Sequence, residues 1–399
     1  MVNQRVRPTP STNSRGIALI AAAHVTDDLY QGVIPAMLPF LVAERHYSYA
    51  AVAGLVLAGT ILSSVAQPLF GWWADRRSGR WLVTAGMLTA GIGVALSGLA
   101  TAYAVTGVAL ALSGLGVAAF HPEAARAARQ AAGNSTRAMS VFAVGGNAGY
   151  ALGPILATPV LVAFGLRGTV LLILPAAVMA VVLLTRLTST IDGTPEHRRT
   201  RTLPTGEDDW RAFSWLTGIV VSRSILFFGI TTFVALYFAH SLGASRSVSA
   251  AALTAFLVAG AAGTLLGGVV ADRTGKLVSI RVGFALMLPA LGGLVLASDV
   301  VVAMGFVVVA GVAAFLPFSV FVMLGQDYLP RRIGTASGVT VGLAVSVGGL
   351  VAPMLGILAD ATSLRTALAV LLVLPVVALA LSSRLHEPRP GDSREPATL

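Results

Sequence analysis

Long apolar stretches recur along this chain and limit its fold more than any other feature of the sequence. Twelve runs of about 20 residues or more are almost free of charge, in a chain that is 56% hydrophobic and 11% charged. A helix of roughly 20 apolar residues crosses the hydrocarbon core of a bilayer, and continuous apolar runs exclude a porin-like barrel. We therefore expect an all-α membrane protein with twelve transmembrane helices, near residues 17–42, 50–74, 81–100, 103–128, 137–163, 168–187, 213–240, 248–271, 278–298, 300–327, 333–358 and 364–385.

The positive charges predict how these helices are oriented. Of the 27 arginines and lysines, 22 fall on the side of the predicted membrane that holds the N-terminus, four fall on the other side, and Arg223 lies within a span. Because cytoplasmic loops are enriched in arginine and lysine, we expect both termini to be cytoplasmic. The net charge of +10 is then a sign of topology and does not indicate a nucleic-acid partner.

One heptapeptide occurs twice and indicates an internal duplication. Residues 116–122 read GVAAFHP and residues 311–317 read GVAAFLP, followed by Glu123 in the first copy and Phe318 in the second. Further matches at a similar offset predict two pseudo-symmetric six-helix bundles. The expected domains are an N-terminal bundle over 1–187, a cytoplasmic linker over 188–212, and a C-terminal bundle with a short cytoplasmic tail over 213–399.

The two copies differ where chemistry is expected. The second copy has Leu316 and Phe318, which we interpret as the scaffold residues used where no chemistry is needed. The first copy places His121 and Glu123 at these positions, inside an apolar stretch. A polar departure from an apolar internal template points to function.

The duplicated topology with its central linker resembles the major facilitator superfamily, and loop motifs strengthen the resemblance. Residues 268–276 match the family's loop between the eighth and ninth helices, with Asp272 and Arg273 beside a glycine turn; the copy with Asp75 and Arg76 carries one extra residue. In such transporters the two halves rock about a site near the midplane of the membrane. The resemblance implies that these residues gate this motion; alternatively, they only cap helices and fix the topology.

A glycine motif in the fifth predicted span suggests export. Gly149, Gly153 and Pro154 are similar to the antiporter motif of the family's drug exporters, although Ala157 stands where a glycine is usual. Small residues let helices pack closely, and proline allows a bend. We therefore expect these three residues to take part in conformational gating.

Six ionisable side chains lie deep in predicted spans, where they are costly without partners and are functional candidates by default. At helical spacing His24, one of the two adjacent acids, and Gln31 share a face. Adjacent residues point about 100° apart on a helix, so one acid should face the cavity while the other pairs with a neighbouring helix. The alternatives are that both acids are structural and that His24 is a packing residue. The six are His24, Asp27, Asp28, His121, Glu123 and Arg223.

Two of these residues allow two interpretations each. The repeat offset gives Arg223 a depth close to that of Asp27 and Asp28, so it can pair with an acid across the halves or bind an anionic substrate group in bidentate fashion. Glu123 lies one helical turn before Arg126, which favours a local ion pair. Alternatively, Glu123 is a proton carrier assisted by His121, a residue type that titrates near neutrality.

Three segments together resemble the fosmidomycin-resistance group of the superfamily: HVTDDLYQG at 24–32, FHPEA at 120–124, and Arg223-Ser224. The resemblance implies a bacterial inner-membrane exporter of a small anionic antibiotic (fosmidomycin is a phosphonate), driven by the proton gradient. The residues expected to couple protons are Asp27, Asp28, His121 and Glu123. The residues expected to bind substrate are His24, Tyr30, Gln31, Asn147, Arg223 and Arg126.

Other functional classes find less support in the sequence. The same scaffold also suits a proton-coupled uptake symporter for a small organic acid or metabolite. An enzyme is not expected, because the chain lacks a P-loop, the zinc motif His-Glu-x-x-His and the nucleophile motif Gly-x-Ser-x-Gly. The chain has no cysteine, which excludes disulfides and thiol chemistry. We expect no cofactor and no metal; the partners are a small substrate, protons and membrane lipid, and the protein is expected to be a monomer.

Overall fold

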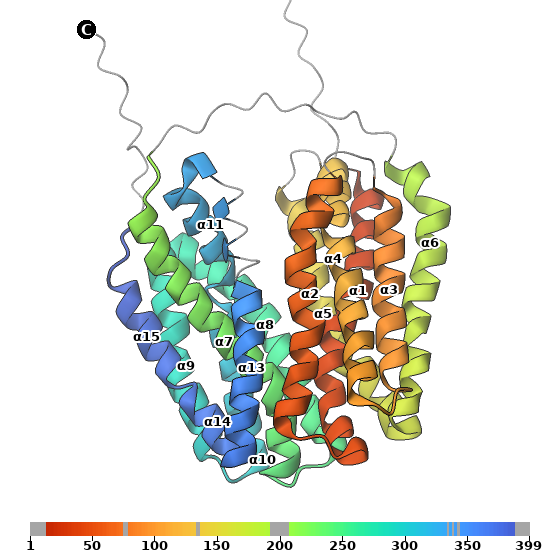
Figure 1. Cartoon of the computed structure of the whole chain (residues 1–399). Helices are drawn as coiled ribbons and strands as arrows, with labels where there is room; N and C mark the ends of the chain where they lie inside the picture. The colour runs from red at the N-terminus through yellow and green to blue at the C-terminus, as the bar shows by residue number, and fades with distance from the viewer. Residues whose placement is uncertain are drawn as a thin grey trace, which may run out of the picture.

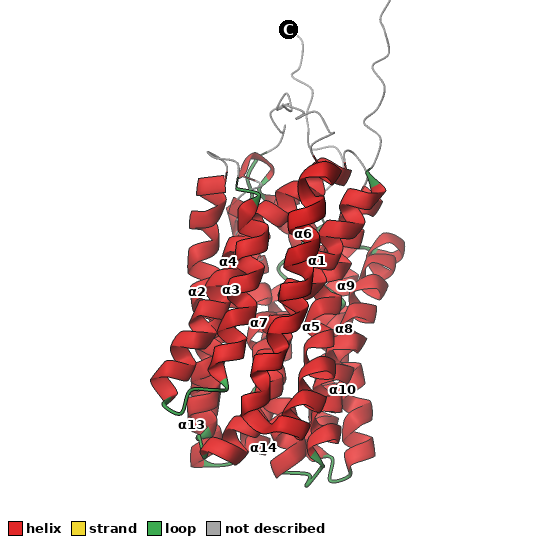
Figure 2. Cartoon of the chain, turned by 90° about the vertical axis from the view of Figure 1, so that its right-hand side faces the viewer, coloured by secondary structure: helices red, strands yellow, loops and turns green. Residues whose placement is uncertain are grey.

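The chain folds into long helices that run roughly side by side. The computed structural model describes residues 13–74, 79–132, 136–191, 207–332, 335–336, 339–340 and 344–387. Within these residues every regular element is helical, which confirms the expected all-α membrane architecture (Figure 2). A helix satisfies its own backbone hydrogen bonds, which is what an apolar chain in lipid requires.

Two groups of helices lie on opposite sides of the molecule (Figure 1). The N-terminal group holds α1 (Ser14–Arg45), α2 (Tyr49–Ala74), α3 (Trp81–Ser97), α4 (Tyr103–Ala132), α5 (Thr136–Phe164), the 3₁₀ segment η1 (Gly165–Ile173) and α6 (Leu174–Ile191). The C-terminal group holds α7 (Trp210–His240), α8 (Arg246–Thr274), α9 (Lys276–Leu296), α10 (Val300–Phe315), α11 (Phe318–Tyr328), η2 (Pro330–Arg332), α13 (Ala344–Ala361), α14 (Leu364–Val370) and α15 (Val373–Ser382). Most of the expected 188–212 linker lies outside the described residues, so its bounds stay a prediction.

The expected spans do not correspond one for one to continuous helices. Eight helical stretches of the described chain are long and apolar enough to cross a membrane, and one of them contains both α5 and α6. Two shorter apolar helices, Trp81–Ser97 and Val347–Ala361, add to these. The 32-residue α1 is not among the eight, because its buried polar residues lower its hydropathy. The count of twelve is therefore not reproduced as twelve unbroken helices.

The two copies of the heptapeptide fold differently. Pro122 lies inside α4, which continues from Tyr103 to Ala132. In the second copy, Leu316 and Pro317 separate α10 from α11. Proline lacks the N–H that continues the helical ladder, but its effect depends on the neighbouring helices. The shared proline is thus compatible with either a continuous or a divided helix.

A tyrosine from α1 holds the junction where η1 becomes α6. The Tyr30 hydroxyl donates to the Leu172 carbonyl and accepts from the Ala176 N–H, both at 3.0 Å. These two backbone groups are four residues apart, so they would pair with each other in an unbroken helix. The hydroxyl therefore bridges a gap in the ladder, a known way of distorting a helix.

The two groups are joined at the end where α1 passes into α2, which we call the closed end. Asp360 at the end of α13 accepts hydrogen bonds from the N–H groups of Tyr49 at 2.8 Å and Ala50 at 2.9 Å. The Arg246 guanidinium lies 5.3 Å from the Phe40 ring centre. These contacts connect α13 and α8 of one group to α2 and α1 of the other. They place the inter-group attachment at the lower end of the molecule in Figure 1, near α10 and α14.

Candidate functional site

A cavity of about 180 Å³ lies between the two groups of helices. Helices α1, α2, α4 and α5 line one side, and α7, α10 and α11 line the other. Much of its wall is aromatic or aliphatic, as is usual for small-molecule sites in which a few polar groups fix the orientation of the ligand. The polar side chains of its wall are Gln31, Thr60, Ser63, Ser113, Asn147, Tyr150, Arg223, Ser224 and Thr340.

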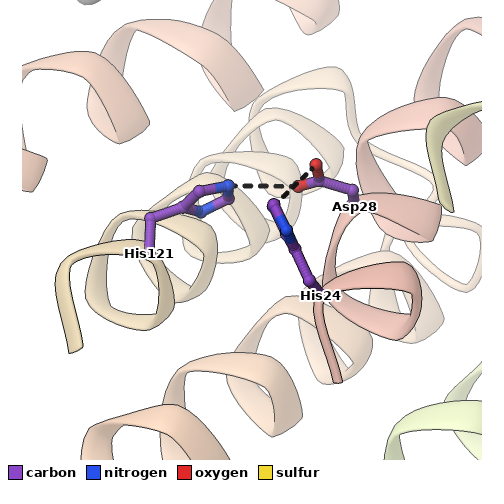
Figure 3. A group of neighbouring side chains, drawn as sticks. All are labelled: His24, Asp28 and His121. Carbon is purple, nitrogen blue, oxygen red and sulfur yellow. Dashed lines mark ion pairs between the residues drawn. The ribbon is translucent and has the colours of Figure 1, made fainter. Parts of the chain in front are cut away.

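A polar cluster lies beside this cavity on α1 and α4. Asp28 is the centre: its Oδ2 is 3.3 Å from His24 Nε2, and its Oδ1 is 3.3 Å from His121 Nε2 (Figure 3). The Gln31 side chain donates a 2.5 Å hydrogen bond to Asp28 Oδ1. Because Gln31 also lines the cavity, it connects the cluster to the place where a substrate would bind.

Backbone carbonyls fix the orientation of both imidazole rings. His24 Nδ1 lies 2.8 Å from the Phe142 carbonyl, and His121 Nδ1 lies 2.9 Å from the Val117 carbonyl. A carbonyl can only accept a hydrogen bond, so each Nδ1 is the donor. Both Nε2 atoms are thereby left to interact with Asp28, and these are the atoms at which the cluster can take up or release a cation.

Asp27 differs sharply from its neighbour. Its side chain is fully buried, and neither carboxylate oxygen has a hydrogen-bond partner among the described residues. Its nearest charged neighbour is His121, whose Nδ1 lies 3.6 Å from Asp27 Oδ2. A buried anion without a donor is very costly, whereas the protonated carboxylic acid is not. Asp28 is thus the acid closer to the cavity, and Asp27 points into the protein, where its partner on a neighbouring helix is His121 of α4.

Arg223 does not form the expected pair with these acids. Among the described residues it makes no ion pair with Asp27 or Asp28, because Arg223 is held within the other group. Its Nε donates to the Ala314 carbonyl at 2.9 Å. Its guanidinium carbon lies 5.5, 4.9 and 4.8 Å from the ring centres of Phe227, Phe315 and Phe318. This aromatic cage stabilises the cation through the ring faces, and Arg223 still lines the cavity.

Glu123 is separated from the cluster that His121 joins. Its side chain is 2% exposed and lies 3.8 Å from Arg126, as the expected local ion pair requires. A methyl group placed on Gly79, in the loop before α3, would lie 3.6 Å from Glu123 Oε2. Residues 121 and 123 point to different sides of α4. Glu123 therefore belongs to the loop end of α2 and α3, and its role as a proton carrier stays a prediction.

The structure divides the predicted substrate ligands into two sets. Gln31, Asn147 and Arg223 line the cavity. His24 does not: it is buried, stacks on Phe142 with ring centres 4.3 Å apart, and belongs to the Asp28 cluster. Tyr30 is fully buried with its hydroxyl occupied by α6, and Arg126 pairs with Glu123.

The predicted gating residues also lie in different environments. Asp75 and Arg76 fall outside the described residues. Asp272 and Arg273 are exposed at the end of α8, and neither forms an ion pair within the described chain. Gly275 makes the expected glycine turn, with a φ of +107°. Instead, Lys276 of the same motif pairs with Asp327 of α11 at 2.5 Å.

The glycines of the fifth predicted span pack directly against α1. A methyl group on Gly149 would lie 2.2 Å from the Val25 carbonyl oxygen, and one on Gly153 would lie 2.6 Å from the Cα of Gly32. Such distances leave no room for a side chain, so the motif brings two backbones together. The motif, which includes Pro154, lies at a contact within the N-terminal group, and its part in gating stays a prediction.

Several cavity residues were not predicted as ligands. Tyr150 lies edge-on to Phe227 of the other group, with ring centres 5.8 Å apart. Phe315 and Phe318 belong to the second copy of the duplicated motif, which we had interpreted as plain scaffold. That interpretation is wrong for Phe318, whose ring contacts the Arg223 guanidinium. No signal in the sequence marked Phe318, because an apolar side chain is ordinary within a membrane span.

Comparison with known proteins gives a consistent result across most of the chain. The family model described as Major Facilitator Superfamily matches residues 20–353. The chain is 32% identical over 386 residues to the fosmidomycin resistance protein of Escherichia coli (strain K12), covering 93% of each sequence. It is 31% identical to an uncharacterized MFS-type transporter, YfnC, of Bacillus subtilis (strain 168), covering 91% of each sequence.

A solved structure shares the fold. The chain superimposes with a TM-score of 0.79 on a bacterial homologue of the human lysosomal transporter Spinster, determined in an inward-facing and occupied conformation. The match covers 97% of this chain and 100% of that one, at 17% sequence identity. At this identity the likeness concerns the arrangement of helices alone.

Proposed function

This chain belongs to the major facilitator superfamily and is a multi-pass membrane transporter, and we propose that it exports a small anionic antibiotic of the fosmidomycin kind in exchange for protons. The proposed location is a bacterial cell membrane with both termini in the cytoplasm. In that orientation the closed end faces outward. The substrate class is supported by the 32% identity to a fosmidomycin resistance protein along nearly the whole chain.

The observation that carries the proton coupling is the state of Asp27. A fully buried carboxylate with no hydrogen-bond donor is stable chiefly as the neutral acid. His121 lies close to both adjacent acids, 3.6 Å from Asp27 and 3.3 Å from Asp28. A proton can therefore pass between these groups with small movements of α4 against α1. We assign the proton-carrying role to Asp27, Asp28 and His121, with His24 holding Asp28 in place and Glu123 as a second candidate.

Arg223 supplies the matching site for an anion. Its charge is balanced by aromatic faces and a carbonyl, so no carboxylate of the described chain competes with a bound anion. Guanidinium groups bind phosphonate and carboxylate oxygens in bidentate fashion. Gln31, Asn147 and Tyr150 provide further hydrogen-bonding groups on the opposite wall.

The coupling follows from the position of Gln31 between the two sites. Its amide donates to Asp28 while its side chain lines the cavity. The Gln31 amide cannot serve Asp28 and a substrate at the same time, so a change in the proton occupancy of Asp28 alters the group that the substrate meets. Substrate and proton occupancy are thus linked through one side chain.

Transport in everted membrane vesicles tests the proposal. With an acidic interior, vesicles that contain the protein should accumulate fosmidomycin, and collapsing the gradient should abolish the accumulation. A neutral diester of the same phosphonate serves as the matched control and should not be carried. Accumulation of fosmidomycin without a pH gradient would contradict proton-coupled export. Movement of fosmidomycin in the same direction as the protons would favour the uptake symporter.

A further inference from the structure

The two histidines of the polar cluster share an arrangement that proton transport alone does not require. Each ring donates through Nδ1 to a backbone carbonyl, Phe142 for His24 and Val117 for His121. Each then directs Nε2 at a different oxygen of the same carboxylate, at 3.3 Å in both cases (Figure 3). Metal-binding histidines are usually oriented in this way, by a hydrogen bond from the ring nitrogen that does not touch the metal.

The two imidazoles and the carboxylate of this cluster need a cation between them. If both rings are neutral, their Nε2 lone pairs face an anionic carboxylate, and three acceptors meet with no donor between them. Gln31 supplies one donor to Asp28 Oδ1 but none to either ring. The conflict is removed by a proton on each Nε2 or by one divalent cation that all three residues bind.

The spacing suits a small transition-metal ion. The candidate ligand atoms of His24, Asp28 and His121 all lie within 4.8 Å of one another. Zinc–nitrogen distances of about 2.0–2.1 Å place neighbouring ligands of a tetrahedral site roughly 3.3 Å apart, which equals the two histidine–carboxylate distances. Two of the three ligands are imidazoles, which suit zinc, copper, iron and nickel, whereas calcium and magnesium prefer sites made of oxygen ligands alone.

We propose that His24, Asp28 and His121 bind a divalent transition-metal ion of the zinc class, with a fourth position open toward the cavity. Ions can reach the site because the His121 side chain is 22% exposed and Gln31, which contacts Asp28, lines the cavity. The metal occupies the nitrogen atoms at which the cluster would otherwise hold protons. Binding therefore excludes those protons.

Metal binding by the purified protein tests this proposal. The full chain, prepared without a polyhistidine tag, is titrated with Co²⁺ while its visible absorption is recorded, and Zn²⁺ is then added as a competitor. The wild type should show one saturable site that Zn²⁺ displaces. His24→Gln and His121→Gln should each weaken binding at least about tenfold, because each removes one of three ligands.

His386→Gln is the matched control. His386 also faces a carboxylate, Asp209 at 3.5 Å, but it is exposed and lies outside the cluster. Its substitution should leave Co²⁺ affinity unchanged. If His24→Gln fails to fold because it loses the stacking on Phe142, His121→Gln decides alone, since its ring is more exposed.

Three results would overturn the metal site: no saturable binding by the wild type, an unchanged affinity in His121→Gln, or an equal loss in His386→Gln. The titration needs no transport, so its failure leaves proton-coupled export untouched. Conversely, a protein that binds one Co²⁺ but carries no phosphonate would contradict the proposed function alone.

Discussion

Asp27 and Asp28 are adjacent in sequence but lie in opposite environments. Asp28 has two imidazoles and an amide around it, whereas Asp27 is fully buried, has no hydrogen-bond donor among the described residues, and has only the His121 ring beside it at 3.6 Å. The 100° step of a helix predicts that two adjacent acids point apart. It does not predict which one meets a partner, because this depends on which residues α4 and α5 present to each face of α1.

The sequence likewise does not reveal which groups stabilise the charge of Arg223. The depth predicted for Arg223 from the repeat agrees with its position in the cavity wall. Of the two interpretations, the ion pair with Asp27 or Asp28 is wrong. Three phenylalanine rings surround it instead. A cation in low dielectric needs partners, and aromatic faces together with a backbone carbonyl provide them here. Composition alone does not distinguish these two solutions.

Arg223→Gln should weaken fosmidomycin binding about 10- to 100-fold, because a hydrogen bond to a charged group contributes roughly 1.5–3 kcal/mol. Calorimetry on the purified protein measures the change. Arg365→Gln is the control, since Arg365 also donates to a backbone carbonyl, that of Ala297, but does not line the cavity. Equal affinity in Arg223→Gln and wild type would remove Arg223 from the binding site.

Tyr30→Phe should lower the stability of the protein without changing substrate affinity. The substitution leaves the Leu172 carbonyl and the Ala176 N–H without their bridge, which costs about 1–3 kcal/mol. Thermal unfolding in detergent should therefore begin at a lower temperature. Tyr47→Phe is the control, because the exposed Tyr47 hydroxyl makes only a 3.4 Å contact with the Thr101 carbonyl, and this variant should unfold like the wild type. A weaker affinity for fosmidomycin with unchanged stability would return Tyr30 to the substrate ligands.

At the scale of elements, the contact between α1 and α5 positions the polar cluster. Gly149 and Gly153 allow the backbones to touch, and Gly146 lies directly against the cluster. The sequence predicts close packing at these glycines because small residues recur at helical spacing. It does not predict that α1 is the partner helix, since any neighbouring helix could use the same face.

Gly146→Ala should disable transport while the protein stays folded. A methyl group there would lie 2.5 Å from Asp28 Oδ2 and 2.7 Å from His24 Nε2, so the cluster must move. Misplacing reactive groups by about 1 Å can cost 100-fold in rate. Gly305→Ala is the matched control, because nothing lies within 4 Å of the added methyl group. Transport at the wild-type rate in Gly146→Ala would show that the geometry of the cluster is not critical.

At the scale of the whole molecule, the closed end holds the two groups of helices together. Asp360 receives the first N–H groups of α2 and so caps a helix that belongs to the other group. A methyl group on Gly356 would lie 2.7 Å from the Cα of Ala50, which shows how closely α13 approaches α2. A carboxylate at a helix N-terminus interacts favourably with the helix dipole. This contact must break if the molecule opens at that end.

Asp360→Ala should therefore shift the molecule toward opening at the closed end. Loss of a cap costs about 1 kcal/mol, which is roughly a fivefold change in the ratio of the two states. The chain has no native cysteine, so spin labels on Ser48→Cys and Ser241→Cys report the separation of the two groups. Asp299→Ala, which removes a cap within one group, should leave that separation unchanged. An identical distance distribution in Asp360→Ala and wild type would contradict this role.

The architecture was more predictable than the site. Apolar runs and the duplicated motif specify membrane helices because lipid leaves few alternatives. The breaks within predicted spans, such as the one between α10 and α11, depend on side-chain packing, which the hydrophobic periodicity of the sequence does not reveal. The polar residues near the cavity were found from their cost in lipid. The aromatic cage and the Asp360 cap were missed, because phenylalanine and an aspartate at the end of a helix are ordinary features of a membrane protein.

The most direct test of the account is the movement of protons that substrate causes. Everted vesicles with an acidic interior carry a pH-sensitive dye, and fosmidomycin is added from outside. The account predicts that substrate entry through the wild type drives protons out and partly restores the dye signal, while Asp27→Asn, which cannot release a proton, gives no response. An equal response in Asp27→Asn, or fosmidomycin uptake by the wild type without any proton movement, would contradict it.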